Sequence, residues 1–87
     1  MKADKNTVSQ LLKTARGQID GILKMVEDDR YCIDIVQQVM AAEAMLRKVQ
    51  TQVLSAHMKT CVKNAQTDAE KEEKIDELIQ IMTRISK

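Results

Sequence analysis

Residues 31–64 read YCIDIVQQVMAAEAMLRKVQTQVLSAHMKTCVKN and contain neither glycine nor proline. The apolar residues of this stretch recur at steps of three and four, which is the spacing of one face of an α-helix. They are Cys32, Val36, Val39, Met40, Leu46, Val49, Val53, Leu54, Met58, Cys61 and Val62. At about 1.5 Å of rise per residue, a helix over this stretch is roughly 50 Å long. The stretch therefore predicts one unusually long central helix.

Two shorter amphipathic segments flank the long helix, over about residues 7–28 and about residues 67–86. Both repeat their apolar positions at helical spacing, so we expect an all-α, three-helix protomer forming one domain over residues 1–87. Gly17 and Gly21 lie on one face of the first segment, where each lowers helix stability by about 1 kcal/mol relative to alanine. This glycine pair therefore favours a close contact with another helix.

Polar clusters mark the expected helix ends. The sequence EDDR at residues 27–30 separates the first two helices, and its aspartates suit the N-terminus of the central helix as caps. Thr67 and Glu70 have the spacing of a capping box, which predicts the start of the third helix at Thr67 as N-cap.

The composition excludes several classes of protein. The 87 residues are 44% hydrophobic and 31% charged, with a net charge of +1 and a single aromatic residue. No apolar run approaches about 18 residues, so we expect no membrane-spanning helix, no signal peptide and a cytoplasmic protein. In that compartment cysteines are thiols or metal ligands more often than disulfides. The short helical chain offers little room for an oxyanion hole, so we expect no enzymatic activity.

A helix of roughly 50 Å is out of scale for a monomer of this length. The segment over about residues 7–28 is roughly 33 Å long and covers only part of the central apolar stripe. The uncovered part requires another chain, so we expect an obligate oligomer with at least a dimer formed through the central helix.

The two cysteines and the single histidine all lie on the central segment. His57 and Cys61 are about one turn apart, and at about 100° per residue Cys32 falls on the same face. Cys32 is nevertheless roughly 38 Å from His57 along the axis, so one helix cannot bring the three together. Two copies laid antiparallel about a two-fold axis near Met45 and Leu46 place Cys32 of one chain opposite the His57–Cys61 pair of the other.

Two thiolates and one imidazole suit copper(I), which prefers soft sulfur ligands. Zinc requires a fourth ligand, and nickel or cobalt more nitrogen and oxygen donors. Such a pair of thiols also fits a redox sensor, because thiolate is the reactive form of cysteine. A third alternative is a helical oligomerisation module without a ligand, in which the cysteines are small core residues.

Four stretches resemble a known family, the copper-sensing operon repressors of the CsoR/RcnR group, which are small helical bacterial transcription repressors. The matching stretches are TARGQIDGI at residues 14–22, YCID at 31–34, HMKTCV at 57–62 and IDEL at 75–78. The resemblance covers nearly the whole chain. It implies a dimer of antiparallel helices that pairs into a homotetramer, and an apo form that binds double-stranded operator DNA and releases it when ligand binds.

Within that family the ligand set separates the subgroups. The pattern of the copper sensors implies Cys32, His57 and Cys61 as copper(I) ligands, with Tyr31 and Glu77 at supporting positions beside them. Glu77 could accept the free imidazole N–H of His57 and so connect the metal to the third helix. Nickel and cobalt sensors carry an additional N-terminal histidine and a histidine in place of the second cysteine, which this chain lacks. Persulfide sensors tend to lack the histidine but keep both cysteines, so persulfide sensing is the alternative to copper sensing.

DNA binding is implied by the resemblance. The family has no helix-turn-helix, so no recognition helix can be named. The candidate DNA-binding residues are basic side chains of the first two helices, namely Lys13, Arg16, Arg47 and Lys48. Leu11 occupies a position that often holds a DNA-contacting arginine in the family. With one aromatic residue, base stacking is excluded as a major contribution, and binding to phosphates should depend strongly on salt.

Overall fold

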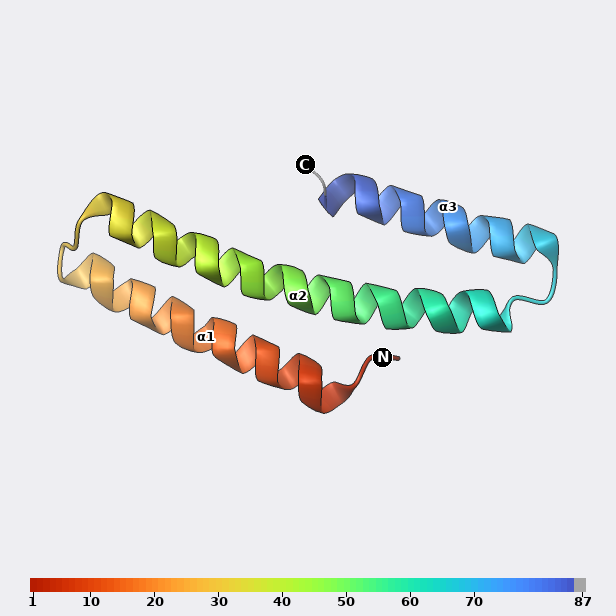
Figure 1. Ribbon diagram of the computed structural model, residues 1–87, viewed down its shortest axis with the longest axis horizontal. Coiled ribbons are helices and arrows are strands. Elements are labelled where there is room, and N and C mark those ends of the chain that lie inside the picture. Colours follow the sequence, from red (N-terminus) through yellow and green to blue (C-terminus); the bar gives the residue numbers. More distant parts are fainter. Residues whose placement is uncertain (86–87) are drawn as a thin grey trace.

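The computed structural model describes residues 1–85 as three helices, α1 (Lys5–Glu27), α2 (Cys32–Asn64) and α3 (Asp68–Ile85). Both α1 and α3 run antiparallel to α2 and lie on opposite sides of it (Figure 1). This arrangement confirms the all-α protomer with one long central helix. The end expected for the third helix, near Ser86, lies outside the described residues.

The three helices form a flat layer that is one helix thick. The Cα atoms extend over 57 × 28 × 12 Å, and their radius of gyration is 17.3 Å. A globular domain of this length would have a radius of gyration of about 12 Å. The Cα atoms of one helix are about 4.6 Å across and packed helix axes lie about 8–10 Å apart, so two stacked layers would need about 13 Å or more. Both faces of the layer are therefore open to solvent.

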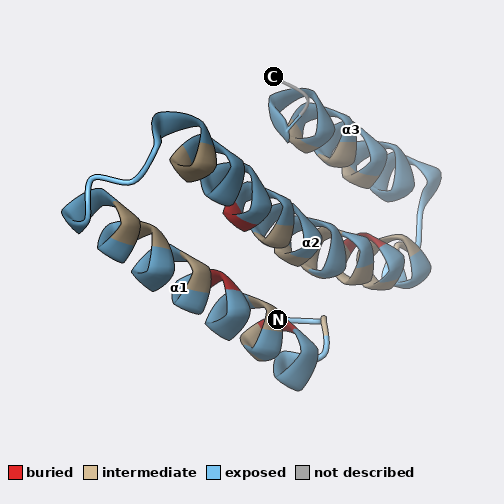
Figure 2. Cartoon of the chain, turned by 60° about the vertical axis from the view of Figure 1, so that its left-hand side comes forward, coloured by how far each residue is buried: buried red, intermediate tan, exposed pale blue. Residues whose placement is uncertain are grey.

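This flat shape leaves very little core, and most of each helix is exposed (Figure 2). Many of the exposed side chains are large and apolar. Within residues 1–85, the buried apolar side chains are Val8, Ala15, Ala42 and Met58. The accessible area is 6940 Å², whereas a compact monomer of 9.9 kDa exposes about 5,200 Å². The excess, on the order of 1,700 Å², is in the range that one protomer buries in an obligate dimer.

Hydrogen bonds at Asp4 determine where α1 begins. Asp4 is the N-cap, and its carboxylate accepts a hydrogen bond of 3.0 Å from the backbone N–H of Thr7. The Thr7 hydroxyl also donates to this carboxylate, and the two hydrogen bonds lower the pKa of Asp4 below its ordinary value. The helix therefore begins at Lys5, two residues before the expected start at Thr7.

Asp29 determines where α1 ends. Asp29 is left-handed, with a φ of 52°. The N–H of Arg30 donates to the carbonyl of Met25 at 3.0 Å, and the N–H of Asp29 donates to the carbonyl of Val26 at 3.2 Å. This pair of hydrogen bonds closes many helices that end in a left-handed residue. The expectation that the aspartates cap the central helix is wrong, because the N-cap of α2 is Tyr31, without a side-chain cap.

The capping box at the start of α3 is present in a modified form. The hydroxyl of Thr67 accepts a hydrogen bond of 3.1 Å from the backbone N–H of Glu70. The carboxylate of Glu70 accepts a hydrogen bond of 2.8 Å from the N–H of Gln66, one residue before the usual donor in a capping box.

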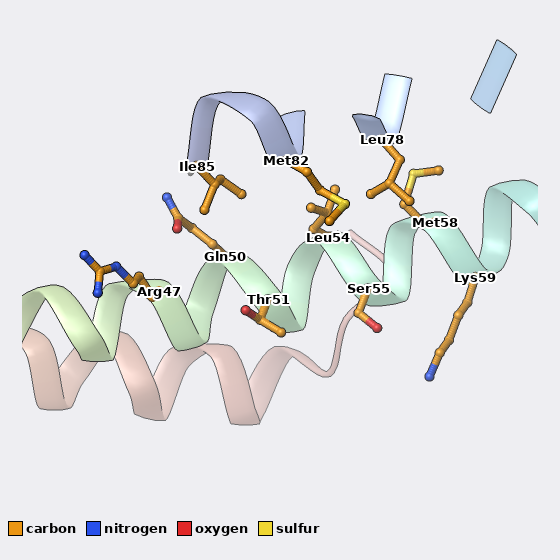
Figure 3. A pocket seen from close by; sticks show the side chains of 10 residues that line it. All are labelled: Arg47, Gln50, Thr51, Leu54, Ser55, Met58, Lys59, Leu78, Met82 and Ile85. Atoms are coloured by element: carbon orange, nitrogen blue, oxygen red, sulfur yellow. The ribbon is translucent and has the colours of Figure 1, made fainter. Parts of the chain in front are cut away.

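The packing of α3 on α2 is apolar. Leu54 and Met58 of α2 point toward α3, and Leu78 and Met82 of α3 point back toward them (Figure 3). Thr51, Ser55 and Lys59 point away from α3, so this packing uses one face of α2.

The close helix contact expected at Gly17 and Gly21 is not made within the chain, and this expectation is wrong for the protomer. A Cβ atom added to either glycine would meet no atom within 4 Å. Both glycines are exposed on α1. Among residues 1–85, no helix combines the length and the apolar character needed to cross a membrane.

Candidate metal centre

His57 and Cys61 lie one turn apart on the second half of α2. The Sγ atom of Cys61 is 3.4 Å from Nε2 of His57 and 3.9 Å from Nδ1. Typical metal distances, about 2.3 Å to sulfur and 2.0 Å to imidazole nitrogen, put two donors of a three-coordinate metal roughly 3.7 Å apart. The observed separations lie on either side of this value. The two side chains therefore have the spacing of a chelating pair.

Glu77 of α3 approaches the same imidazole. Its Oε1 atom is 3.8 Å from Nε2 of His57, and both side chains are about half exposed. The separation is longer than a hydrogen bond and would have to shorten to about 3 Å for the expected bond to form. If Nδ1 faces a metal together with Cys61, Nε2 is the nitrogen left to donate to Glu77.

Lys74 extends this line of contacts, although it belongs to none of the sequence motifs. Its Nζ atom is 3.8 Å from Oε2 of Glu77, so the two oxygens of the carboxylate face different side chains. The Lys74 side chain is 37% exposed, which is low for a lysine. The spacing of three residues between Lys74 and Glu77 on one helix is the signal that could have found this pair.

The N-terminal residues also lie close to this site. Met1 and Lys2 line one hollow together with His57 and Glu77. The sequence pattern gave no indication of this contact, because both residues precede the first periodic segment.

Cys32 and Tyr31 lie at the opposite end of α2. Cys32 is the first residue of the helix and is exposed, and Tyr31 is its N-cap with 68% exposure. Because α2 is continuous from Cys32 to Asn64, Cys32 is roughly 43 Å from Cys61. In the part of the chain that the structure describes, no three His, Cys, Asp or Glu side chains gather as a metal site. One chain thus holds two of the three predicted ligands together.

The four candidate DNA-binding residues are exposed on α1 and α2. They are Lys13, Arg16, Arg47 and Lys48. The guanidinium of Arg47 lies 3.8 Å from the carboxylate of Glu43, and both side chains are well exposed, so this ion pair contributes little. Arg47 and Lys48 line a shallow hollow with Leu11 of α1, which places both helices at one surface.

Comparison with known sequences places this chain among regulators. Residues 4–84 match the family model described as metal-sensitive transcriptional repressor. The copper-sensing transcriptional repressor CsoR of Mycobacterium ulcerans is 43% identical over 68 residues, and the match covers 78% of this chain and 58% of that protein. CsoR of Bacillus subtilis is 36% identical over 84 residues, or 97% of this chain and 83% of that protein. The chain thus spans little more than half the length of the mycobacterial relative.

Solved structures share the fold. The copper-sensing repressor CsoR with Cu(I) from Geobacillus thermodenitrificans is 37% identical and aligns with a TM-score of 0.83, over 100% of this chain and 94% of that chain. The nickel-responsive transcriptional regulator InrS is 26% identical and aligns with a TM-score of 0.79, over 97% of this chain and 94% of that chain. Because sequence and fold agree over nearly the whole length, the chain belongs to the family of metal-sensitive transcriptional repressors.

Proposed function

We propose that this chain is a copper(I)-responsive transcriptional repressor whose apo form binds operator DNA and whose copper-bound form releases it. The proposal places it in the cytoplasm, where bacterial DNA lies. The relatives are named as copper-sensing, which favours copper over persulfide. The family consists of transcriptional repressors, so the chain is not an enzyme, as expected. The observation that carries the proposal is the nitrogen–sulfur donor pair formed by Nδ1 of His57 and Sγ of Cys61, 3.9 Å apart.

The third donor comes from a second copy of the chain. A two-fold axis near Met45 and Leu46 lays two α2 helices antiparallel, so that the partner's Cys32 meets His57 and Cys61. The exposed apolar side chains on the first half of α2 support this contact, because nothing in residues 1–85 buries them. They are Ile33, Val36, Val39, Met40 and Leu46. Symmetry gives two equivalent sites per dimer, and the family resemblance extends the assembly to a dimer of dimers.

The residues present fit copper(I). The partner's Cys32 together with His57 and Cys61 would hold the ion through two thiolates and one imidazole, and such soft ligands select it. Copper(I) bound there would add a bridge between the two chains through ligands from both. Once its 3.8 Å separation from Nε2 shortens to a hydrogen bond, Glu77 would orient the imidazole of His57 by accepting its free N–H, and so link α3 to the ligands on α2. The partner's Tyr31, next to its Cys32, would lie at the edge of the same site.

The DNA-binding surface is proposed on α1 and α2, away from α3. Lys13, Arg16, Arg47 and Lys48 are exposed there. Helix α3 carries more acidic than basic side chains and would repel phosphates. Its acidic residues are Asp68, Glu70, Glu72, Glu73, Asp76 and Glu77, against the basic residues Lys71, Lys74 and Arg84. The same two-fold axis brings Arg47 and Lys48 of both chains together. Fixing the two α2 helices relative to each other therefore changes the spacing of the charges that meet DNA.

Copper(I) titration of the reduced protein against a strong chelator, combined with gel mobility of a promoter fragment, tests this proposal. We expect one tightly bound copper per chain and release of the DNA. His57→Ala should keep DNA binding, retain some copper through two thiolates and lose most of the copper-driven release. Ser55→Ala is the control, because Ser55 is exposed and lies two residues before His57. This variant should bind copper and release DNA as the unmodified protein does. If copper releases DNA from the His57→Ala variant as fully as from the unmodified protein, His57 is not a ligand and the proposed site is wrong.

A further inference from the structure

We propose that Lys74 sets the metal preference of the site. Its ammonium group holds the Glu77 carboxylate as a hydrogen-bond acceptor for His57 and keeps that carboxylate from becoming a metal ligand. This inference rests on the proposed copper site and names the residue that excludes a divalent competitor.

A turn of the Glu77 carboxylate would add an oxygen donor to the metal site. Its Oε1 atom is 3.8 Å from Nε2 of His57, and the same Nε2 atom is 3.4 Å from Sγ of Cys61, so a metal held by Nε2 and Sγ would have this carboxylate beside it. With the partner's Cys32, this carboxylate would complete a set of two sulfurs, one nitrogen and one oxygen. Zinc prefers four ligands of these types in a tetrahedron. The same side chains therefore offer three soft donors to copper(I), or four donors to a divalent ion.

Lys74 is positioned to decide between these two donor sets. Its Nζ atom lies 3.8 Å from Oε2 of Glu77, one turn earlier on α3. The Lys74 and Glu77 side chains are 37% and 48% exposed, whereas those of the Arg47–Glu43 pair are 69% and 55% exposed. The Lys74–Glu77 pair is therefore less screened by water. To bind a metal, the Glu77 carboxylate would have to turn and weaken its attraction to this ammonium group.

The net charge of the metal with its two thiolates also indicates that Lys74 favours copper(I) over zinc(II). Copper(I) bound by two thiolates carries a single negative charge, so the carboxylate of Glu77 beside it is repelled unless a cation neutralises it. Zinc(II) bound by two thiolates is neutral and gains from a negatively charged fourth ligand. Removing the positive charge of Lys74 should therefore favour zinc and disfavour copper.

Lys74→Gln in the full-length reduced protein tests this inference. Zinc(II) and copper(I) affinities would be measured by chelator competition, and cobalt(II) would report the coordination number through its visible absorption. We expect zinc affinity to rise about tenfold, copper affinity to fall by about threefold or less, and cobalt(II) to show the stronger bands of a four-coordinate site. Lys74→Arg keeps the charge and should keep the original preference.

Two further variants make the result decisive. Lys71→Gln removes the same charge from an exposed position one turn earlier on α3 and should change neither affinity. In the double variant with Lys74→Gln and Glu77→Gln, the gain in zinc affinity should disappear, because the carboxylate that binds zinc is gone. An unchanged zinc affinity in Lys74→Gln, or an equal rise in Lys71→Gln, would overturn this inference while leaving copper sensing intact. Absence of copper binding by the unmodified protein would instead overturn the proposed function.

Discussion

Cys32 and Cys61 lie on the same face of one continuous helix, at its two ends, roughly 43 Å apart. A ligand that needs both sulfurs must therefore bridge two chains. The exposed apolar face of α2 that begins beside Cys32 requires a second chain for a separate reason, the burial of its side chains. The proposed metal site and the proposed assembly are thus two consequences of the same long helix.

Leu46→Glu should dissociate the assembly. Leu46 is 41% exposed in the protomer and lies near the proposed two-fold axis, so the substitution would bury two carboxylates against each other. Light scattering at micromolar concentration should then give a monomer mass. Gln52→Glu adds the same charge on the side of α2 away from Cys32 and should leave the mass unchanged. A folded, helical monomer of the unmodified chain would contradict the proposed assembly.

Glu77→Ala should separate copper binding from DNA release. The ligands His57 and Cys61 remain, so copper(I) affinity should stay within about tenfold of the original. Because this variant has no carboxylate to link α3 to the imidazole, copper should release less DNA in a gel-mobility titration. Glu73→Ala, one turn earlier on α3, serves as the control. Full release by Glu77→Ala would show that the signal does not pass through α3.

Helix periodicity was enough to predict the three helices, because their apolar stripes are long and contain few helix breakers. The ends of the helices depend on hydrogen bonds that periodicity does not encode. Asp4 captures the N–H of Thr7 and starts α1 early, and the left-handed Asp29 closes it where a glycine would be expected. Aspartate is common both as an N-cap and in tight turns, so its role at residues 28–29 could not be decided from its identity.

The spacing of Cys32, His57 and Cys61 predicted a shared helix face, and the structure places all three on α2. Their meeting about a two-fold axis remains a prediction. The Lys74–Glu77 ion pair lies within α3, and its spacing of three residues could have predicted it. The approach of this pair to His57 depends on how α3 folds back over α2, which the apolar stripe of α3 does not determine because it fits several partners. The spacing of apolar and metal-binding residue types therefore identified the donor residues, but it did not predict that Lys74 lies beside them.

Asp29→Gly should stabilise the protein. A left-handed non-glycine residue carries strain of about 1 kcal/mol or more, which glycine relieves, while greater freedom of the unfolded chain offsets part of the gain. We expect the free energy of unfolding in urea to rise by about 0.5–1 kcal/mol at fixed protein concentration. Asp28→Gly is the matched control, because Asp28 has a φ of −88° and gains nothing from glycine. If Asp29→Gly lowers the free energy of unfolding as much as Asp28→Gly does, the left-handed conformation of Asp29 carries no strain that glycine relieves.

Replacing Arg47 and Lys48 by glutamine should weaken DNA binding by the apo protein, and the loss of affinity should be the same for every DNA sequence. The slope of log affinity against log salt should become shallower by about 0.9 for each phosphate that the protein no longer neutralises. Fluorescence anisotropy over a series of salt concentrations measures both effects. The pair Lys71→Gln and Arg84→Gln removes equal charge from exposed positions on α3 and should leave the slope unchanged. An equal effect of the two pairs would show that only net charge matters.

If each copper site is shared between two chains, mixing two defective variants should restore complete sites. Cys32→Ala retains His57 and Cys61, while Cys61→Ala retains the complementary Cys32, so neither variant alone can build a complete site. Refolded together in equal amounts, half of the dimers should be mixed, and each mixed dimer should contain one complete site. Chelator competition should then find about one quarter of the original number of tight copper(I) sites, and none in either variant alone. If the mixture binds no more copper tightly than the separate variants do, the site is not shared between chains and the proposed arrangement is wrong.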